Sequence, residues 1–306
     1  TDAEYRAQLA SLHQAMNGQS ADIVPADRKL YALRDVTGTD ESIPLICSSI
    51  LSKKMAEGID SLVLDVKCGL GAFMKTEVEA RQLAESLVAI STSMGKPTSA
   101  ILTRMDEPLG HMIGNSLEVI EAIDCLKGKG PADLMEVTYA LCAEMLSLGG
   151  IQSTQEGAMI ALKSAIDSGA ALEGFRALIE AQGGDGTVVD NYNCLPRTEN
   201  TKDIVLNNDS TMYVEGLDAR SFGDAACILG AGRASTDSII DPAVGIEILK
   251  KAGQAIQPNK AIARIHYQSV DTLEAAEARL EKAIKLSAEK PVVTSLIIDR
   301  ISHGKC

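Results

Sequence analysis

Four side chains in the segment 39–54 have residue types and a spacing that could bind a flat polar ring. Ile46, Ser49, Ile50 and Lys53 follow one another at intervals of three, one and three residues. Because an α-helix has about 3.6 residues per turn, these intervals place all four on one helical face. The two isoleucines could cover the faces of the ring, while Ser49 and Lys53 meet its polar edge.

The same pattern also has a purely structural interpretation. Isoleucines at helical spacing usually mean burial, and the hydroxyl of Ser49 can bond to its own backbone. Lys53 is followed by Lys54, and lysines at a helix end interact favourably with the negative end of the helix dipole. The spacing alone leaves both interpretations open.

The expected helix has recognisable ends and a polar turn before it. Asp40 can cap it, Pro44 is tolerated in its first turns, and Gly58 ends it. Upstream, the turn at 30–37 carries a second cation, Arg34. Turn and helix together would therefore present cations, a hydroxyl and apolar side chains.

Beyond this helix, strand and helix patterns alternate. Short apolar runs at 61–66 and 98–103 predict buried parallel strands, and helices are expected at about 76–94 and 115–126. This alternation is typical of an α/β fold with a mostly parallel central sheet. Functional sites in such folds lie at the carboxyl ends of the strands.

The downstream half has a different character. Residues 131–182 have a helical pattern throughout, and the composition changes at the glycine-rich segment 183–186. From about residue 200, strand-like pieces alternate with expected helices, which predicts a C-terminal α+β lobe. The strand-like pieces are at 210–214 and 261–267, and the helices are expected at about 219–228, 242–251 and 271–287.

Composition excludes several kinds of partner and site. The 42 acidic and 29 basic residues give a formal charge of -13, which repels nucleic acid and anionic membrane surfaces. The seven cysteines are scattered, odd in number and without a CxxC pair, so neither a disulfide framework nor a metal site is expected. No apolar run approaches the roughly 20 residues that span a bilayer. We therefore predict a cytoplasmic protein without metal or cofactor.

Longer strings of sequence carry a family resemblance that no single short motif would support. Taken together and in order, they resemble the thymidine and pyrimidine-nucleoside phosphorylases over nearly the whole chain. The strings are Y-A-L-R-D-V-T at 31–37, S-I-P-L-I at 42–46, S-I-L-S-K-K at 49–54, L-V-L-D-V-K-C-G-L-G-A-F-M at 62–74, P-L-G at 108–110, G-N-S-L-E-V at 114–119, G-A-G-R at 230–233 and D-S-I-I-D-P-A-V-G at 237–245.

The resemblance implies both a reaction and an architecture. Members of this family cleave a pyrimidine nucleoside such as thymidine with inorganic phosphate as co-substrate, and they yield free base and pentose 1-phosphate. A homodimer is expected for the full-length protein. The implied domains are part of a helical domain with its hinge at 1–57, an α/β domain at 58–199 and the C-terminal lobe at 200–306. The active site would lie between the first two.

The resemblance also implies roles for six residues. Arg34 and Lys53 would donate to the carbonyl oxygens of the base, and Ser49 would contact its O4 or N3. These donors would stabilise the negative charge that builds on the departing pyrimidine. The walls of the ring site would be Tyr31, Ile46 and Ile50.

One part of the family pattern is missing. The resembled enzymes hold phosphate with a Lys-His-Ser-Thr-Gly-Gly type loop, and no such string occurs in these 306 residues. Two hypotheses follow. Either the sequence lacks the N-terminal part of a phosphorylase and is inactive without it, or it is a truncated, non-catalytic relative that binds pyrimidine or acts as an interaction module.

Overall fold

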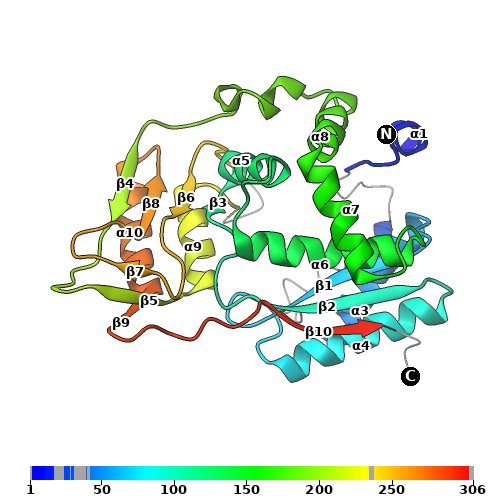
Figure 1. Ribbon diagram of the computed structural model, residues 1–306, viewed down its shortest axis with the longest axis horizontal. Coiled ribbons are helices and arrows are strands. Elements are labelled where there is room, and N and C mark those ends of the chain that lie inside the picture. The colour runs from blue at the N-terminus through cyan, green and yellow to red at the C-terminus, as the bar shows by residue number, and fades with distance from the viewer. Residues whose placement is uncertain are drawn as a thin grey trace.

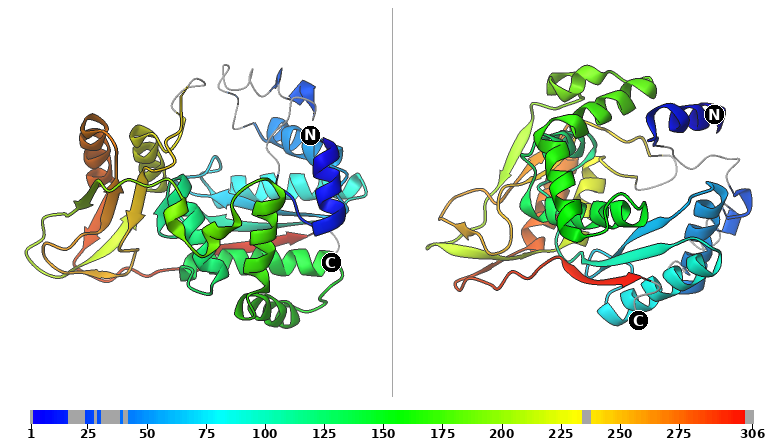
Figure 2. Two further views of the ribbon diagram at one scale, coloured as in Figure 1. Left: turned by 90° about the horizontal axis from the view of Figure 1, so that it is seen from above. Right: turned by 45° about the vertical axis from the view of Figure 1, so that its right-hand side comes forward.

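The computed structural model describes residues 2–16, 24–27, 29–30, 39, 42–233 and 238–302. Tyr31 and Arg34, two of the predicted site residues, lie outside these ranges. Figures 1 and 2 show two parts side by side, an α/β part with a helical cover and a smaller C-terminal lobe. Within the described residues, no helix is long and apolar enough to cross a membrane.

The α/β part is built around two parallel strands. β1 (Leu62–Cys68) and β2 (Thr98–Arg104) pair in register and are connected by α4 (Glu77–Ser93). Every residue of β2 up to Thr103 is buried, as expected for a parallel strand that is covered on both faces. Figure 1 shows α3 (Ile43–Ala56) and α4 on one side of the sheet and α6 (Ala132–Leu148) on the other. The predicted α/β fold class is confirmed.

A third strand of this sheet comes from the far end of the chain. β10 (Ile297–Ser302) pairs antiparallel with β2, so the strand order is β1-β2-β10. Ion pairs of 2.6 Å between Arg81 and Asp299 and of 2.9 Å between Arg300 and Glu144 tie β10 to α4 and α6. The last strand of the predicted 200–306 lobe therefore lies in the sheet of the α/β part, and the described sheet is mixed.

Further helices precede or follow α6 in the α/β part. They are α5 (Asn115–Leu126), α7 (Gln155–Asp167) and α8 (Ala170–Ala181), with two 3-10 turns at Gly186–Val189 and Tyr192–Cys194. Of these helices, α7 packs on α6 and on α8. The second turn is fixed to α5 because the Tyr192 hydroxyl donates to Asp124 at 2.5 Å. α1 (Asp2–Leu12) lies beside α8, where the Gln14 amide donates to the Gly174 carbonyl at 2.6 Å.

The C-terminal lobe is an α+β unit with its own core, as predicted. Two antiparallel sheets, β3-β6-β8-β4 and β7-β5-β9, pack with α9 and α10 around fully buried side chains such as Phe222, Ile246 and Leu280. The elements are β3 (Met112–Ile113), β4 (Thr201–Ile204), β5 (Met212–Leu217), α9 (Ala219–Leu229), β6 (Gly245–Ile248), β7 (Ala255–Ile256), β8 (Ala263–His266), α10 (Val270–Ala283) and β9 (Ile284–Ser287).

Two expected helices of this lobe are wrong in whole or in part. Residues 245–248 form strand β6 instead of a helix, because Ile246 and Ile248 both enter the core while Glu247 faces outward. This alternation extends over only four residues, and in so short a run the sequence does not distinguish a strand from one turn of a helix. The predicted helix 271–287 ends at Ala283, and Ile284 begins a strand that pairs with β5.

Candidate functional site

The predicted ring-binding face of α3 borders a pocket of about 330 Å³. Three of the four residues on that face, Ile46, Ser49 and Ile50, line it together with side chains from β1, α4 and the loop between them. The helix forms close to where it was expected, with proline in its first turn and two lysines in its last turn, but its N-cap is Ser42. Asp40, the predicted cap, lies outside the described residues. Ser49 is 6% exposed although it is polar, so its hydroxyl sits at an otherwise apolar wall.

Lys53 reaches this pocket through Ser49. Its ammonium donates to the Ser49 hydroxyl at 2.8 Å and to the Ser49 carbonyl at 2.9 Å, and it forms an ion pair with Asp27. The described lining of the pocket includes Ser49 but not Lys53. Lys53 therefore lies in the last turn of α3 with its ammonium bound to Asp27 and Ser49, and its side chain is 27% exposed.

The structure adds an aromatic wall that the sequence argument did not select. Phe73 and Met74 line the same pocket from the loop that follows β1. This loop passes close to the end of β2. A Cβ on Gly71 would lie 2.8 Å from the Met105 carbonyl, and Gly69 has φ +124, so both positions favour glycine. The sequence signals for Phe73 were its place after the carboxyl end of a predicted strand and its inclusion in the family-resembling string at 62–74.

A charged pair borders the pocket at the end of β1. The Lys67 ammonium lies 2.6 Å from the Asp65 carboxylate, and the Thr103 hydroxyl donates to the other oxygen of that carboxylate at 2.5 Å. Both Asp65 and Lys67 line the pocket. The site thus combines apolar walls with a hydroxyl and an acid–base pair. Among the described residues, no three His, Cys, Asp or Glu side chains gather in an arrangement that could hold a metal ion.

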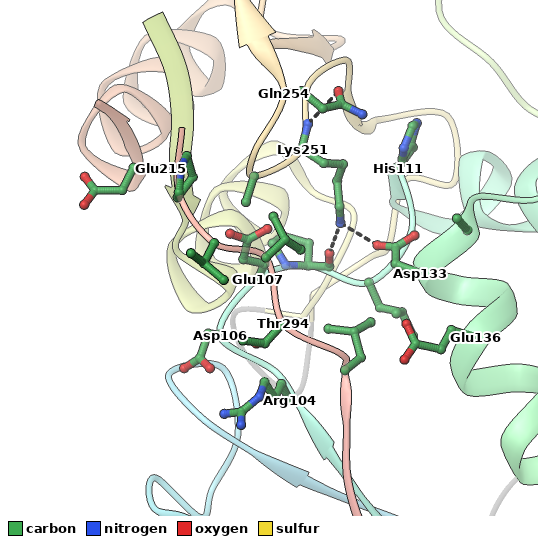
Figure 3. Close-up of a pocket in the computed structure, with 18 residues that line it drawn as sticks. Arg104, Asp106, Glu107, His111, Asp133, Glu136, Glu215, Lys251, Gln254 and Thr294 are labelled. Atoms are coloured by element: carbon green, nitrogen blue, oxygen red, sulfur yellow. Dashed lines mark hydrogen bonds and ion pairs between the residues drawn. The ribbon is translucent and has the colours of Figure 1, made fainter. Parts of the chain in front are cut away.

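A larger cavity of about 460 Å³ lies where the two parts of the molecule meet (Figure 3). Its walls come from the loop after β2, the start of α6, the turn between β6 and β7, and the segment that leads to β10. In Figure 3 the Lys251 side chain points toward Asp133, with an ion pair of 2.8 Å. Lys251 also donates to the carbonyls of Pro108 and Gly110. None of the four predicted site residues that the structure describes borders this cavity, and we regard it as a structural junction.

Two acids of the junction have opposite pKa shifts. Burial raises the pKa of Glu107, and this effect outweighs the attraction of Lys251 and the backbone N–H groups of Leu217 and Ala252. Burial acts in the same direction on Asp133. There, however, the hydrogen bond and charge of Lys251 dominate, helped by backbone N–H groups, so the pKa of Asp133 lies below its usual value.

The raised pKa of Glu107 predicts a stabilising substitution. A carboxyl whose folded pKa is raised contributes stability below its unfolded pKa of about 4.3, and that stability is lost as pH rises through the folded pKa. Glu107→Gln removes the ionisation, so we expect the variant to be more stable than the wild type at pH 7 and to lose this advantage near pH 4. Urea unfolding at the two pH values measures this. An advantage that grows toward low pH would contradict it.

The comparisons with known proteins agree with this organisation. Residues 2–172 match the family model described as the glycosyl transferase family, a/b domain, and residues 213–287 match the pyrimidine nucleoside phosphorylase C-terminal domain. The first match covers the α/β part with its helical cover, and the second covers most of the C-terminal lobe. The chain therefore belongs to the pyrimidine-nucleoside phosphorylase family, as the sequence resemblance implied.

Individual relatives are similar over almost the whole chain. It is 44% identical over 288 residues to the pyrimidine-nucleoside phosphorylase of Geobacillus stearothermophilus, which is 94% of this chain and 66% of that protein. It is 45% identical over 287 residues to the enzyme of the same name from Staphylococcus aureus strain USA300, which is 94% of this chain and 65% of that protein. The chain thus spans slightly less than two thirds of the length of these relatives.

Proposed function

We propose that this protein is a pyrimidine-nucleoside phosphorylase that converts thymidine and phosphate into thymine and 2-deoxyribose 1-phosphate. The observation that carries the proposal is the pocket on α3, where Ile46 and Ile50 flank the Ser49 hydroxyl and Lys53 lies 2.8 Å behind it. A volume of about 330 Å³ falls within the range of roughly 300–1,000 Å³ that is common for small-molecule sites.

The chemistry makes such a pocket useful. The bond between the sugar C1′ and the base nitrogen breaks, and its electron pair leaves with the pyrimidine. A phosphate oxygen then forms the new bond to C1′, and the base takes up a proton. Because negative charge develops on the carbonyl oxygens of the base, a fixed donor such as the Ser49 hydroxyl, with the Lys53 ammonium 2.8 Å behind it, stabilises the transition state more than the bound substrate. We assign the same task to Arg34 and a wall position to Tyr31, on the family resemblance.

A direct test is phosphate-dependent thymine release by the native protein from its source, combined with its intact mass. We expect thymine from thymidine only when phosphate is present. We also propose that the 306-residue chain expressed alone releases little or no thymine, because it contains no Lys-His-Ser-Thr-Gly-Gly type loop. Equal turnover by the isolated chain would overturn that part of the proposal.

The missing loop string also keeps a second candidate function open, a pyrimidine-binding protein without the chemistry. It predicts a native mass near 32.3 kDa, no thymine release, and thymine binding that is lost in Arg34→Ala. Calorimetry with thymine is combined with the release assay on the native protein: the binding protein binds thymine without releasing it from thymidine, whereas the phosphorylase does both.

A further inference from the structure

Asp27 is a buried acid that pairs with Lys53 and that the sequence argument did not single out. It is 7% exposed, and its carboxylate forms an ion pair with Lys53, whose side chain is 27% exposed. The two residues lie 26 positions apart, so the contact is tertiary. A buried carboxylate is costly unless it is paired and hydrogen-bonded, and Lys53 supplies that partner.

The ion pair between Asp27 and Lys53 determines which acceptors the Lys53 ammonium binds. An ammonium group has three N–H donors, and Lys53 directs them to the Asp27 carboxylate, the Ser49 carbonyl and the Ser49 hydroxyl. Ser49 therefore receives a hydrogen bond from a cation, and its own O–H proton is not used in that contact. Since Ser49 lines the pocket, this proton can be donated to a ligand there.

We propose that Asp27 is a positioning residue, which holds the Lys53 ammonium against the Ser49 hydroxyl so that Ser49 acts as a polarised donor to the departing base. Asp27, Lys53 and Ser49 form a chain of charge-assisted hydrogen bonds, and such chains strengthen each member. The inference rests on the proposed phosphorolysis. Asp27 does not touch the substrate itself, and its effect passes entirely through Lys53.

A double-mutant cycle in the native-length protein tests this dependence. We expect Asp27→Asn to lower kcat/KM for thymidine about tenfold, mostly through kcat, because an amide cannot hold the ammonium as a carboxylate does. In a Lys53→Met background, the same substitution should change kcat/KM less than about twofold, since the group that it positions is gone. Asp27→Glu, which keeps the charge, should recover part of the loss.

The control removes an acid–base pair that lies far from the pocket. Asp203→Asn breaks the ion pair of 2.7 Å with Arg264 between β4 and β8, and it should leave kcat/KM for thymidine unchanged. Thermal midpoints of all variants separate lost folding from lost positioning. If Asp27→Asn does not fold, the comparison of Asp27→Glu with the wild type, with and without Lys53→Met, tests the same dependence.

The outcomes separate this inference from the proposed function. The positioning role would be overturned if Asp27→Asn lowered kcat/KM equally in the wild type and in the Lys53→Met background. It would also be overturned if the substitution changed only KM. If the wild-type protein shows no phosphate-dependent thymine release, the proposed function fails instead. Thymine binding measured by calorimetry then tests whether Asp27 acts on Ser49 through Lys53. The wild type, in which Ser49 is polarised, should bind thymine several times more tightly than Asp27→Asn.

Discussion

Replacing Lys53 with methionine is expected to lower kcat/KM for thymidine about a hundredfold in the native-length protein. Removing one fixed donor that acts on developing negative charge typically costs about 3 kcal/mol of transition-state stabilisation, and each 1.4 kcal/mol is about tenfold in rate. Methionine preserves most of the side-chain volume, so the change is mainly one of charge and hydrogen bonding. We expect a similar loss for Arg34→Ala on the resemblance.

The leaving group provides the sharpest measurement of this effect. Steady-state phosphorolysis should be compared for thymidine and for a nucleoside whose pyrimidine carries an electron-withdrawing 5-substituent. Such a base stabilises its own negative charge, so the loss caused by Lys53→Met should be much smaller with it. An equal loss for both substrates would mean that Lys53 contributes to ground-state binding or to folding instead.

Folding has to be followed in the same variant. Lys53→Met leaves the Asp27 carboxylate, 7% exposed, without its ion-pair partner, and an uncompensated buried charge is destabilising. Asp27→Asn combined with Lys53→Met removes that charge and should restore the thermal midpoint without restoring activity. Recovery of both together would show that lost stability, and not lost chemistry, had lowered the rate.

Lys251→Met is expected to destabilise the protein by about 2 kcal/mol, because breaking a partly buried ion pair from one side leaves the other charge unpaired. The side chains of Lys251 and Asp133 are 14% and 23% exposed. The substitution also leaves the carbonyls of Pro108 and Gly110 without this donor. Since Lys251 belongs to the C-terminal lobe and its partners to the α/β part, the loss should loosen the junction of the two.

Two comparisons make this prediction specific. Lys202→Met removes a surface pair of 3.6 Å with Glu277 and should cost less than about 1 kcal/mol by urea unfolding at pH 7. Asp133→Asn in the Lys251→Met background should recover stability, since it removes the unpaired charge. A cost for Lys251→Met no larger than that for Lys202→Met would contradict the assignment of Lys251 to the junction.

The pH dependence of the junction has a defined sign. Lys251 keeps the folded pKa of Asp133 below its usual value. This pair therefore contributes stability that is present above the unfolded pKa of about 3.9 and is lost as pH falls through the folded pKa. The wild type should lose stability below about pH 4 more steeply than Lys251→Met does. If the free energies of unfolding of the wild type and of Lys251→Met fell equally steeply below about pH 4, the ion pair of Lys251 with Asp133 would not be the cause of the acid dependence.

Sequence alone predicted the parts of the site that depend on local periodicity. The face formed by Ile46, Ser49 and Ile50 follows from about 3.6 residues per turn, and the structure places those three at one pocket. The parallel strands β1 and β2 were predicted from short, buried apolar runs. The family was recognisable because several ordered strings spread over the chain. The roles of the six site residues stay predictions, and Tyr31 and Arg34 lie outside the described residues.

Tertiary structure alone decided the contacts between segments that are distant in sequence. No local pattern links Asp27 to Lys53, Phe73 to α3 or Lys251 to Asp133, because these pairs meet only after the chain has folded. β10 joins β2 from nearly 200 residues away in sequence, and β6 is a strand because its isoleucines enter the core of the lobe. Helical periodicity is a property of neighbouring residues, so sequence determined it. Strand pairing and buried charge pairs depend on which distant partners satisfy hydrogen bonds and exclude water, which only the folded chain specifies.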